Sequence, residues 1–188
     1  MKTILKSALI LTVAVGATAF TTTMNKKINI EESTIVWTGK KVLGSHTGTI
    51  GLKEGNLEMD GDNLIGGMFV VDMTSINVTD QEGENKAKLE GHLKSNDFFG
   101  VEEHPTATLV INSATKNADG FIVKGDITIK GHTEKIEFDL DMGKDFAATS
   151  LKIDRTKFGI EYKSGSIFDS LGDAAISDNF ELDVTLKF

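Results

Sequence analysis

The chain has 188 residues, one proline, no cysteine and a formal net charge of −8 at pH 7. This length fits a single domain with a sizeable core, and the lack of cysteine excludes disulfides, thiol catalysis and thiolate metal sites. The negative charge makes nucleic acid and anionic membrane surfaces poor partners.

The N-terminal segment has the parts of a secretory signal peptide. It has a short basic start, an apolar run over residues 8–15, and the small-x-small cleavage pattern Ala17-Thr18-Ala19. The apolar run is shorter than the roughly 20 residues that a membrane-spanning helix needs. We therefore expect residues 1–19 to be removed near Ala19. Residues 20–188 then form one exported domain, periplasmic or extracellular, without stable membrane insertion.

The following segment shows the alternation of apolar and polar residues that is typical of β-strands. Strands are predicted from residue 28 onward, over 46–52 and over 64–74, with turns at 54–56 and 60–63.

The alternation is more regular after Pro105. The predicted elements are a strand around 107–111, a turn at 117–120, a strand at 121–129, a turn at 131–132, a strand at 136–142, a turn at 143–145, a strand at 147–158, a polar flap at 164–178 and a last strand at 181–188.

About eight strands joined by short hairpin turns, with no helix-rich region, favour an all-β fold. We predict an extended antiparallel β-barrel, with a β-sandwich as the alternative. A barrel of this size is either filled by its own side chains or holds one small ligand.

Residues 82–105 interrupt the β pattern. Thr79 and Glu82 match a capping box, and Leu89 and Leu93 share one face of a predicted helix. Two glycines within this helix each weaken it by about 1 kcal/mol. We therefore predict a short helix and loop that act as a lid over one barrel end. The residues expected to make the apolar contacts of this lid are Leu89, Leu93, Phe98 and Phe99.

Several motifs resemble those of the YceI-like family. They are residues 88–99 (KLEGHLKSNDFF) followed by His104-Pro105, Trp37-Thr38-Gly39, His46-Thr47-Gly48-Thr49, residues 125–133 (GDITIKGHT) and residues 154–160 (DRTKFGI). The resemblance spans essentially the whole predicted domain in the right order. It implies a lipocalin-like barrel of an exported bacterial protein, whose lumen binds a long isoprenoid chain.

Inward-facing apolar residues are the candidates for the lumen wall. They are Trp37, Phe69, Leu109, Phe121, Val123, Ile127, Ile129, Phe138, Leu140, Leu151 and Ile153. A ligand head group would have His46, His92 and Arg155 as candidate contacts. For Arg155 the alternative is a structural salt bridge to Asp154, Asp173 or Asp178. The four histidines lack metal-ligand spacing, so neither a metal site nor a cofactor is expected.

Three functions are compatible with this reading. The first is an isoprenoid-lipid carrier or store without catalysis. The second is a secreted interaction module with a filled core, and the third is an enzyme on a hydrophobic substrate with His92 or Asp97 as acid or base. The change Gly125→Trp should block an open lumen at a modest cost in stability and unfold a filled one. A homodimer that hides a barrel mouth is a further expectation.

Overall fold

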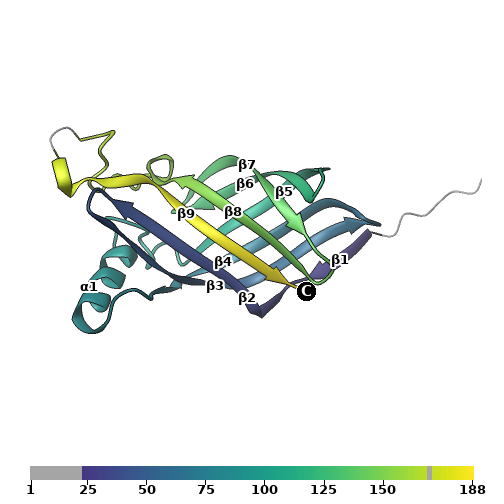
Figure 1. Ribbon diagram of the computed structural model, residues 1–188, viewed down its shortest axis with the longest axis horizontal. Coiled ribbons are helices and arrows are strands. Elements are labelled where there is room, and N and C mark those ends of the chain that lie inside the picture. Colours follow the sequence, from purple (N-terminus) through teal and green to yellow (C-terminus); the bar gives the residue numbers. More distant parts are fainter. Residues whose placement is uncertain (1–22, 169–170) are drawn as a thin grey trace, which may run out of the picture.

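The computed structural model describes residues 23–168 and 171–188, and it shows a closed antiparallel β-barrel with one α-helix at one end (Figure 1). The predicted signal peptide, residues 1–19, lies outside the described residues. The elements are β1 (Thr23–Lys27), β2 (Asn29–Lys41), β3 (Gly44–Asp60), β4 (Asn63–Val78), α1 (Gly83–Lys94), β5 (Thr106–Lys116), β6 (Gly120–Ile129), β7 (His132–Met142), β8 (Phe146–Asp154), the 3-10 helices η1 (Arg155–Phe158) and η2 (Gly172–Ala174), and β9 (Ile176–Lys187).

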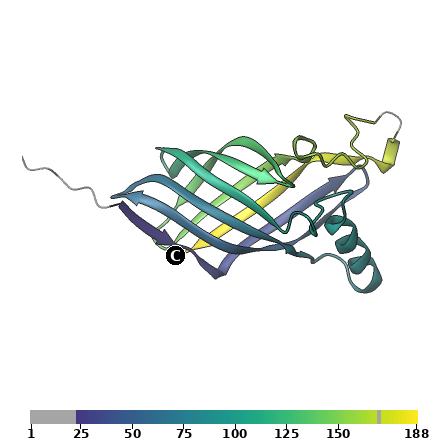
Figure 2. The same ribbon diagram turned by 180° about the vertical axis from the view of Figure 1, so that it is seen from behind.

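The sheet closes on itself. Its strands follow the order β3-β2-β9-β8-β7-β6-β5-β4, and β4 pairs back with β3. Strand β1 precedes β2 and pairs with the far end of β3, from Thr23 opposite Asp60 to Lys27 opposite Asn56. The nine strands of the described residues therefore build an eight-stranded barrel, seen from behind in Figure 2. This confirms the predicted barrel over the sandwich.

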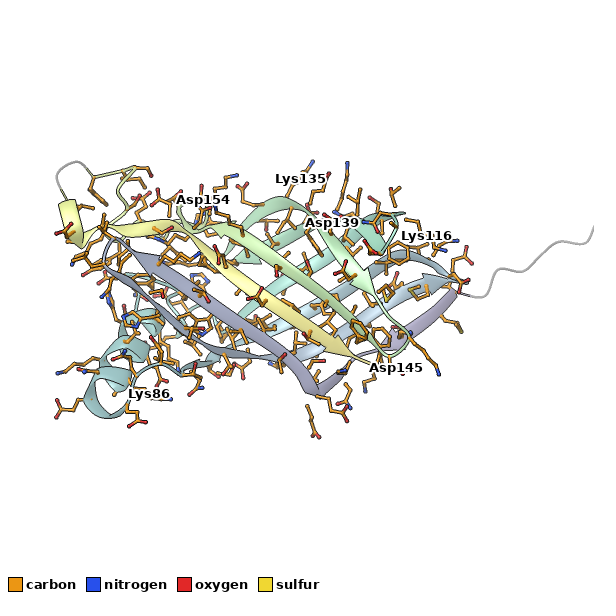
Figure 3. The ribbon with its side chains drawn as sticks, viewed as in Figure 1. Lys86, Lys116, Lys135, Asp139, Asp145 and Asp154 are labelled. Carbon is orange, nitrogen blue, oxygen red and sulfur yellow. The ribbon has the colours of Figure 1, made fainter. Side chains whose placement is uncertain are left out.

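Alternation along each strand separates a dry interior from a wet exterior. In β6, Phe121, Val123 and Ile127 are buried, whereas Ile122 and Lys124 are exposed. Charged side chains such as that of Lys135 lie on the outer surface (Figure 3).

The interior holds two clusters of buried side chains. One fills the barrel end near β1, which we call the closed end, and includes Ile28, Leu57, Leu64, Phe121, Val123 and Leu186. The other lies toward α1, at what we call the lid end, and includes Met73, Phe98, Val101, Ile153, Phe158 and Ile160.

The predicted turn at residues 54–56 is wrong, because β3 runs without interruption through Gly55. A β-bulge between Leu52 and Glu54 bends the strand against β4 instead. A side chain at Gly55 would meet the Phe69 ring at 3.0 Å and Ile28 at 3.1 Å. The glycine thus serves close packing and not chain reversal.

The predicted strand over residues 147–158 is too long, because β8 ends at Asp154. Oδ1 of Asp154 accepts hydrogen bonds from the N–H of Thr156 at 3.0 Å and from its hydroxyl at 2.7 Å. This side-chain cap starts η1, and Gly159 ends it in the left-handed conformation with φ of 68°.

The predicted weak helix is present as α1, but the predicted capping box is wrong. Glu82 is the N-cap residue and makes no side-chain cap bond, whereas the Thr79 N–H donates to the Thr47 carbonyl at 3.0 Å. No residue of α1 is buried, and Glu90 accepts a hydrogen bond from the Val78 N–H at 2.8 Å. Polar bonds to the end of β4 therefore hold the helix. Among the described residues, no helix has the length and apolar character needed to cross a membrane.

Strands β7 and β8 form a weak seam in the wall. Within these two fully described strands, pairing occurs only at Asp141 with Ala148 and Met142 with Ala147. The Thr149 hydroxyl donates to the Asp139 carbonyl at 2.6 Å across the gap beyond them. The other neighbouring strands share five or more register positions.

Gly48 is expected to be intolerant of any side chain. It lies opposite Trp37 in the β2–β3 ladder, and a Cβ atom there would overlap the Asn77 carbonyl and the indole ring. Gly48→Ala should lower the free energy of unfolding by about 1–3 kcal/mol, measured by urea denaturation followed by circular dichroism. The control Gly39→Ala, with no atom within 4 Å of the new methyl group, should change it by less than about 0.5 kcal/mol. Equal effects of the two changes would contradict this account.

Candidate ligand-binding site

The barrel encloses a cavity of about 190 Å³ between the closed end and the lid. Its lining comes from strands all around the wall and from the lid segment after α1, and it is almost entirely apolar. The volume exceeds that of a packing defect between well-fitted side chains, since native cores leave few voids larger than a water molecule. The interior is therefore filled by side chains at the closed end and hollow beneath the lid.

Eight of the eleven predicted wall residues line this cavity. They are Trp37, Phe69, Leu109, Ile127, Ile129, Phe138, Leu140 and Leu151. They come from six strands, so the closed wall brings together residues that are far apart in the sequence.

The other three predicted wall residues, Phe121, Val123 and Ile153, do not line the cavity. Phe121 and Val123 are buried in the cluster that fills the closed end, and Ile153 packs in the cluster beneath the lid. All three side chains are buried as predicted. Alternation indicates which face a residue occupies, but not its height along the barrel, and height decides whether a buried side chain meets cavity or core.

Further residues that line the cavity were not predicted. They are Ile35, Ile50, Leu52, Val71, Met73, Ile76, Ala107, Ile111, Ile176, Phe180, Leu182, Val184 and Leu186. Val71 and Met73 share the face of Phe69 on β4, and Leu182, Val184 and Leu186 alternate on β9. The same period-two signal that predicted the other wall residues was present on these two strands.

Gly125 offers no room for a lumen-blocking side chain, so the expectation for Gly125→Trp is wrong. A Cβ atom at this position would overlap the carbonyl oxygen of Val110 on β5. Even the smallest substitution there disturbs the β5–β6 ladder before it reaches the cavity.

Three of the four predicted lid contacts reach the cavity. Leu93, Phe98 and Phe99 line it, whereas Leu89 is half-buried on α1 and does not. The Phe99 ring meets Phe180 of β9 edge-on, with centroids 6.1 Å apart. The lid thus closes the cavity through residues at and after the end of α1, because the loop and not the helix body turns over the barrel.

The two predicted histidine contacts lie outside the cavity lining. Nδ1 of His46 is 2.9 Å from Oδ2 of Asp80. The His92 ring stands edge-on to Phe98 at 4.9 Å and to Tyr162 at 4.6 Å, and its Nε2 lies 3.8 Å from Asp97. His92 therefore packs behind the lid, and the structure does not bring either histidine to the predicted ligand.

Arg155 lines the cavity, but its guanidinium is engaged by the protein itself. Nε donates to the Ser177 carbonyl at 2.9 Å, Nη1 to that of Ile160 at 2.6 Å and Nη2 to that of Ile176 at 3.1 Å. Nη2 also lies 3.7 Å from Asp178, the structural salt bridge that was the alternative to a head-group contact. Burial lowers the pKa of Arg155. The side chain ties η1 to the start of β9.

Residues from the ends of β2 and β9 line the cavity near the lid. Gly39 and Lys40 of β2 and Ile176 and Ser177 of β9 contribute to its lining, and we call this region the mouth. Nζ of Lys40 forms an ion pair with Glu181 at 2.6 Å. Within residues 23–168 and 171–188 there is no group of three or more His, Cys, Asp or Glu side chains that fits a metal ion.

Comparison with known proteins gives one family. The model of the YceI-like domain matches residues 27–188. A UPF0312 protein of Staphylococcus epidermidis is 27% identical over 155 residues, which cover 72% of this chain and 81% of the relative. A UPF0312 protein of Staphylococcus aureus is 40% identical over 68 residues, covering 36% of this chain and 34% of the relative.

Solved structures share the fold. The crystal structure of Burkholderia cenocepacia BcnA matches with a TM-score of 0.68 and 17% identity, over 85% of this chain and 98% of that one. A polyisoprenoid binding domain from Saccharophagus degradans, implicated in plant cell wall breakdown, matches with a TM-score of 0.59 and 12% identity, over 85% and 95%. At these identities the likeness shows a common barrel architecture.

Replacement of the Arg155 guanidinium is expected to destabilise the protein strongly. Arg155→Met leaves three backbone carbonyls without their donor and the carboxylate of Asp178 without its ion-pair partner, so the free energy of unfolding should fall by about 3–5 kcal/mol in urea denaturation. Lys157→Met removes one exposed charge from the same 3-10 helix and should change it by less than about 0.5 kcal/mol. A loss for Arg155→Met no larger than that of the control would contradict the tie.

The Asp178 carboxylate should contribute stability that is lost in acid. Burial would raise its pKa, but the Ser164 and Ser166 hydroxyls and the charge of Arg155 outweigh it and hold the pKa below the ordinary value of 3.8. A folded-state pKa below the unfolded value stabilises the fold above pH 3.8, and this contribution disappears as the pH falls through the folded-state pKa.

Asp178→Asn should therefore be less stable than the wild type at neutral pH, and the difference should shrink below pH 3.8. Urea denaturation of both proteins across this range measures it. A difference that does not change with pH would contradict the assignment.

Proposed function

Because the chain belongs to the YceI-like family, we propose that it is an exported binding protein that holds a long-chain isoprenoid lipid in its barrel cavity, as a carrier or store without catalysis. The observation that carries this proposal is the apolar cavity of about 190 Å³ beneath the lid. Its walls offer a hydrocarbon chain contact on all sides and few polar groups that would require a partner.

The energetics of such a ligand are favourable. Each buried CH2 group contributes about 0.8 kcal/mol, so a five-carbon isoprene unit contributes up to about 4 kcal/mol. Micromolar affinity requires about −8 kcal/mol, which a few units supply even after several kcal/mol of association and ordering costs. Affinity then resides in the wall, and a polar head group mainly orients the ligand near the mouth.

One prediction and one comparison also support the proposal. The predicted signal peptide at residues 1–19 favours export. In an aqueous compartment outside the cytoplasm, a water-insoluble lipid needs a binding protein to move between membranes. The Saccharophagus degradans neighbour is a polyisoprenoid binding domain of the same fold. An exported location and a homodimer stay predictions.

The cavity also bears on the alternatives. An interaction module with a filled core would have no cavity of this size. It would also bury Phe138 completely, whereas Phe138 is half-buried and lines the cavity. For an enzyme, His92 and Asp97 would have to face the substrate, but neither belongs to the cavity lining. If a turnover activity on an isoprenoid substrate were found and lost in His92→Ala and Asp97→Asn, the proposal of binding without catalysis would be abandoned.

The direct test is recovery of the ligand. The protein is purified without detergent from cells that express the full chain, and it is examined by native mass spectrometry and by organic extraction. We expect an isoprenoid lipid in the extract and saturable binding of a fluorescent polyprenyl analogue. Absence of both would refute the proposed function.

A side chain that fills the cavity should block binding without unfolding the protein. Leu109→Trp adds volume at the cavity wall, whereas Val110→Trp places the same group on the exposed outer face of β5. Leu109→Trp should weaken binding of the polyprenyl analogue about tenfold or more, a loss of about 1.4 kcal/mol, with a modest change in melting temperature. Val110→Trp should leave affinity unchanged. Unfolding of Leu109→Trp, with the outer-face control stable, would instead indicate a core without usable space.

A further inference from the structure

Two large apolar residues form the tip of the β2–β3 hairpin. Val42 and Leu43 are the two turn residues between Lys41 and Gly44, and they are 58% and 68% exposed. Two-residue hairpin turns favour asparagine, aspartate and glycine, whose backbone adopts the required conformations. Neither the turn nor the core therefore accounts for these side chains.

A second pair of exposed apolar residues lies in a segment that shares a surface hollow with this tip. Ile167 and Phe168, in the segment before β9, are 44% and 47% exposed. The Val42 N–H donates a hydrogen bond to the Ala175 carbonyl at 3.3 Å. Val42 and Ala175 line an open hollow of about 390 Å³ together with Gly165 and Ser166, which directly precede Ile167. Figure 1 shows the end of β2 and this segment at the same end of the barrel. We call Val42, Leu43, Ile167 and Phe168 the apolar rim.

The apolar rim is continuous with the mouth of the ligand cavity. Gly39 and Lys40 line the cavity and precede the hairpin tip on β2. Ile176 and Ser177 line both the cavity and the open hollow beside the rim. A hydrocarbon chain that leaves the cavity at the mouth therefore emerges next to the rim.

We propose that the apolar rim docks on the surface of a lipid bilayer and that the isoprenoid passes between bilayer and cavity at the mouth. This inference rests on the proposed function, because a water-insoluble ligand needs a membrane as its source and destination. The rim suits this partner: its apolar side chains belong to two exposed turns, and Lys41 beside them has a long stem that keeps its ammonium group in the interfacial water.

The net charge of the chain indicates that apolar contacts, and not charge attraction, would drive binding of the rim to a bilayer. A formal net charge of −8 opposes attraction to an anionic surface, so docking depends on the apolar side chains. Zwitterionic phosphatidylcholine vesicles should therefore bind the protein at least as well as vesicles that also contain anionic phosphatidylglycerol. Added salt should not weaken the association with either.

Vesicle flotation and lipid transfer test the rim directly. The wild type, Val42→Ser with Leu43→Ser, and Ile167→Ser with Phe168→Ser are compared on phosphatidylcholine vesicles. The matched control, Val110→Ser with Ile122→Ser, removes exposed apolar groups from the outer wall. Each rim variant should lose vesicle association about tenfold or more, since removal of two aliphatic or aromatic side chains from the interface forfeits that much partitioning. The control should behave as the wild type.

A second readout separates docking from ligand binding. Transfer of the fluorescent polyprenyl analogue from vesicles should slow about tenfold in the rim variants. Their affinity for the analogue added from solution, and their melting temperature, should stay unchanged. If the wild type does not bind the analogue in solution, the proposed function is refuted. Vesicle association is measured without the analogue, so it tests docking by itself.

Several outcomes would overturn the docking proposal. They are a wild type that does not associate with vesicles, rim variants that associate as well as the wild type, and an equal loss in the outer-wall control. Conversion of a dimer to a monomer by Val42→Ser with Leu43→Ser, seen in sedimentation velocity, would assign the rim to a second copy of the chain and would also overturn it.

Discussion

Pairing of β3 with β4 closes the sheet, and the remaining features of the structure depend on this closure. A closed sheet has no free edges, so alternate residues of all its strands must share one interior. Large side chains such as Phe121 and Leu57 fill that interior at the closed end. Toward the lid, the wall residues leave the cavity unfilled. Closure of the sheet therefore satisfies the strand edges and also encloses a cavity that the lid covers.

The lid end is organised differently from the wall. The helix α1 has no buried residue and is held to β4 by Glu90, while Phe98 and Phe99 after it reach the cavity. Across the mouth, Arg155 joins η1 to the start of β9 through backbone carbonyls. Polar bonds therefore position the covering elements, and apolar side chains face the cavity.

Period-two alternation predicted the barrel and the inward faces of its strands, because burial on one face of a strand leaves a direct imprint on the sequence. It did not predict the position of a residue along the barrel axis. Alternation therefore assigns Phe121 and Val123 to the cavity wall, although they lie in the core cluster of the closed end. It also did not distinguish a glycine of a turn from Gly55, whose reason is the neighbouring Phe69 ring. The bonds of Arg155 to carbonyls have no sequence pattern, because any residue supplies a backbone acceptor.

The sparse pairing between β7 and β8 makes this seam the part of the barrel wall that resists deformation least. Between other neighbouring strands, a change in barrel circumference requires many ladder hydrogen bonds to break together. Strands β7 and β8 are paired only at Asp141–Ala148 and Met142–Ala147, so few such bonds oppose their separation. Phe138 and Leu151, on either side of the gap, both line the cavity. The cross-section of the barrel is thus set by side-chain packing along one line and by backbone pairing along all others, so a change of cross-section along this line needs no change in topology.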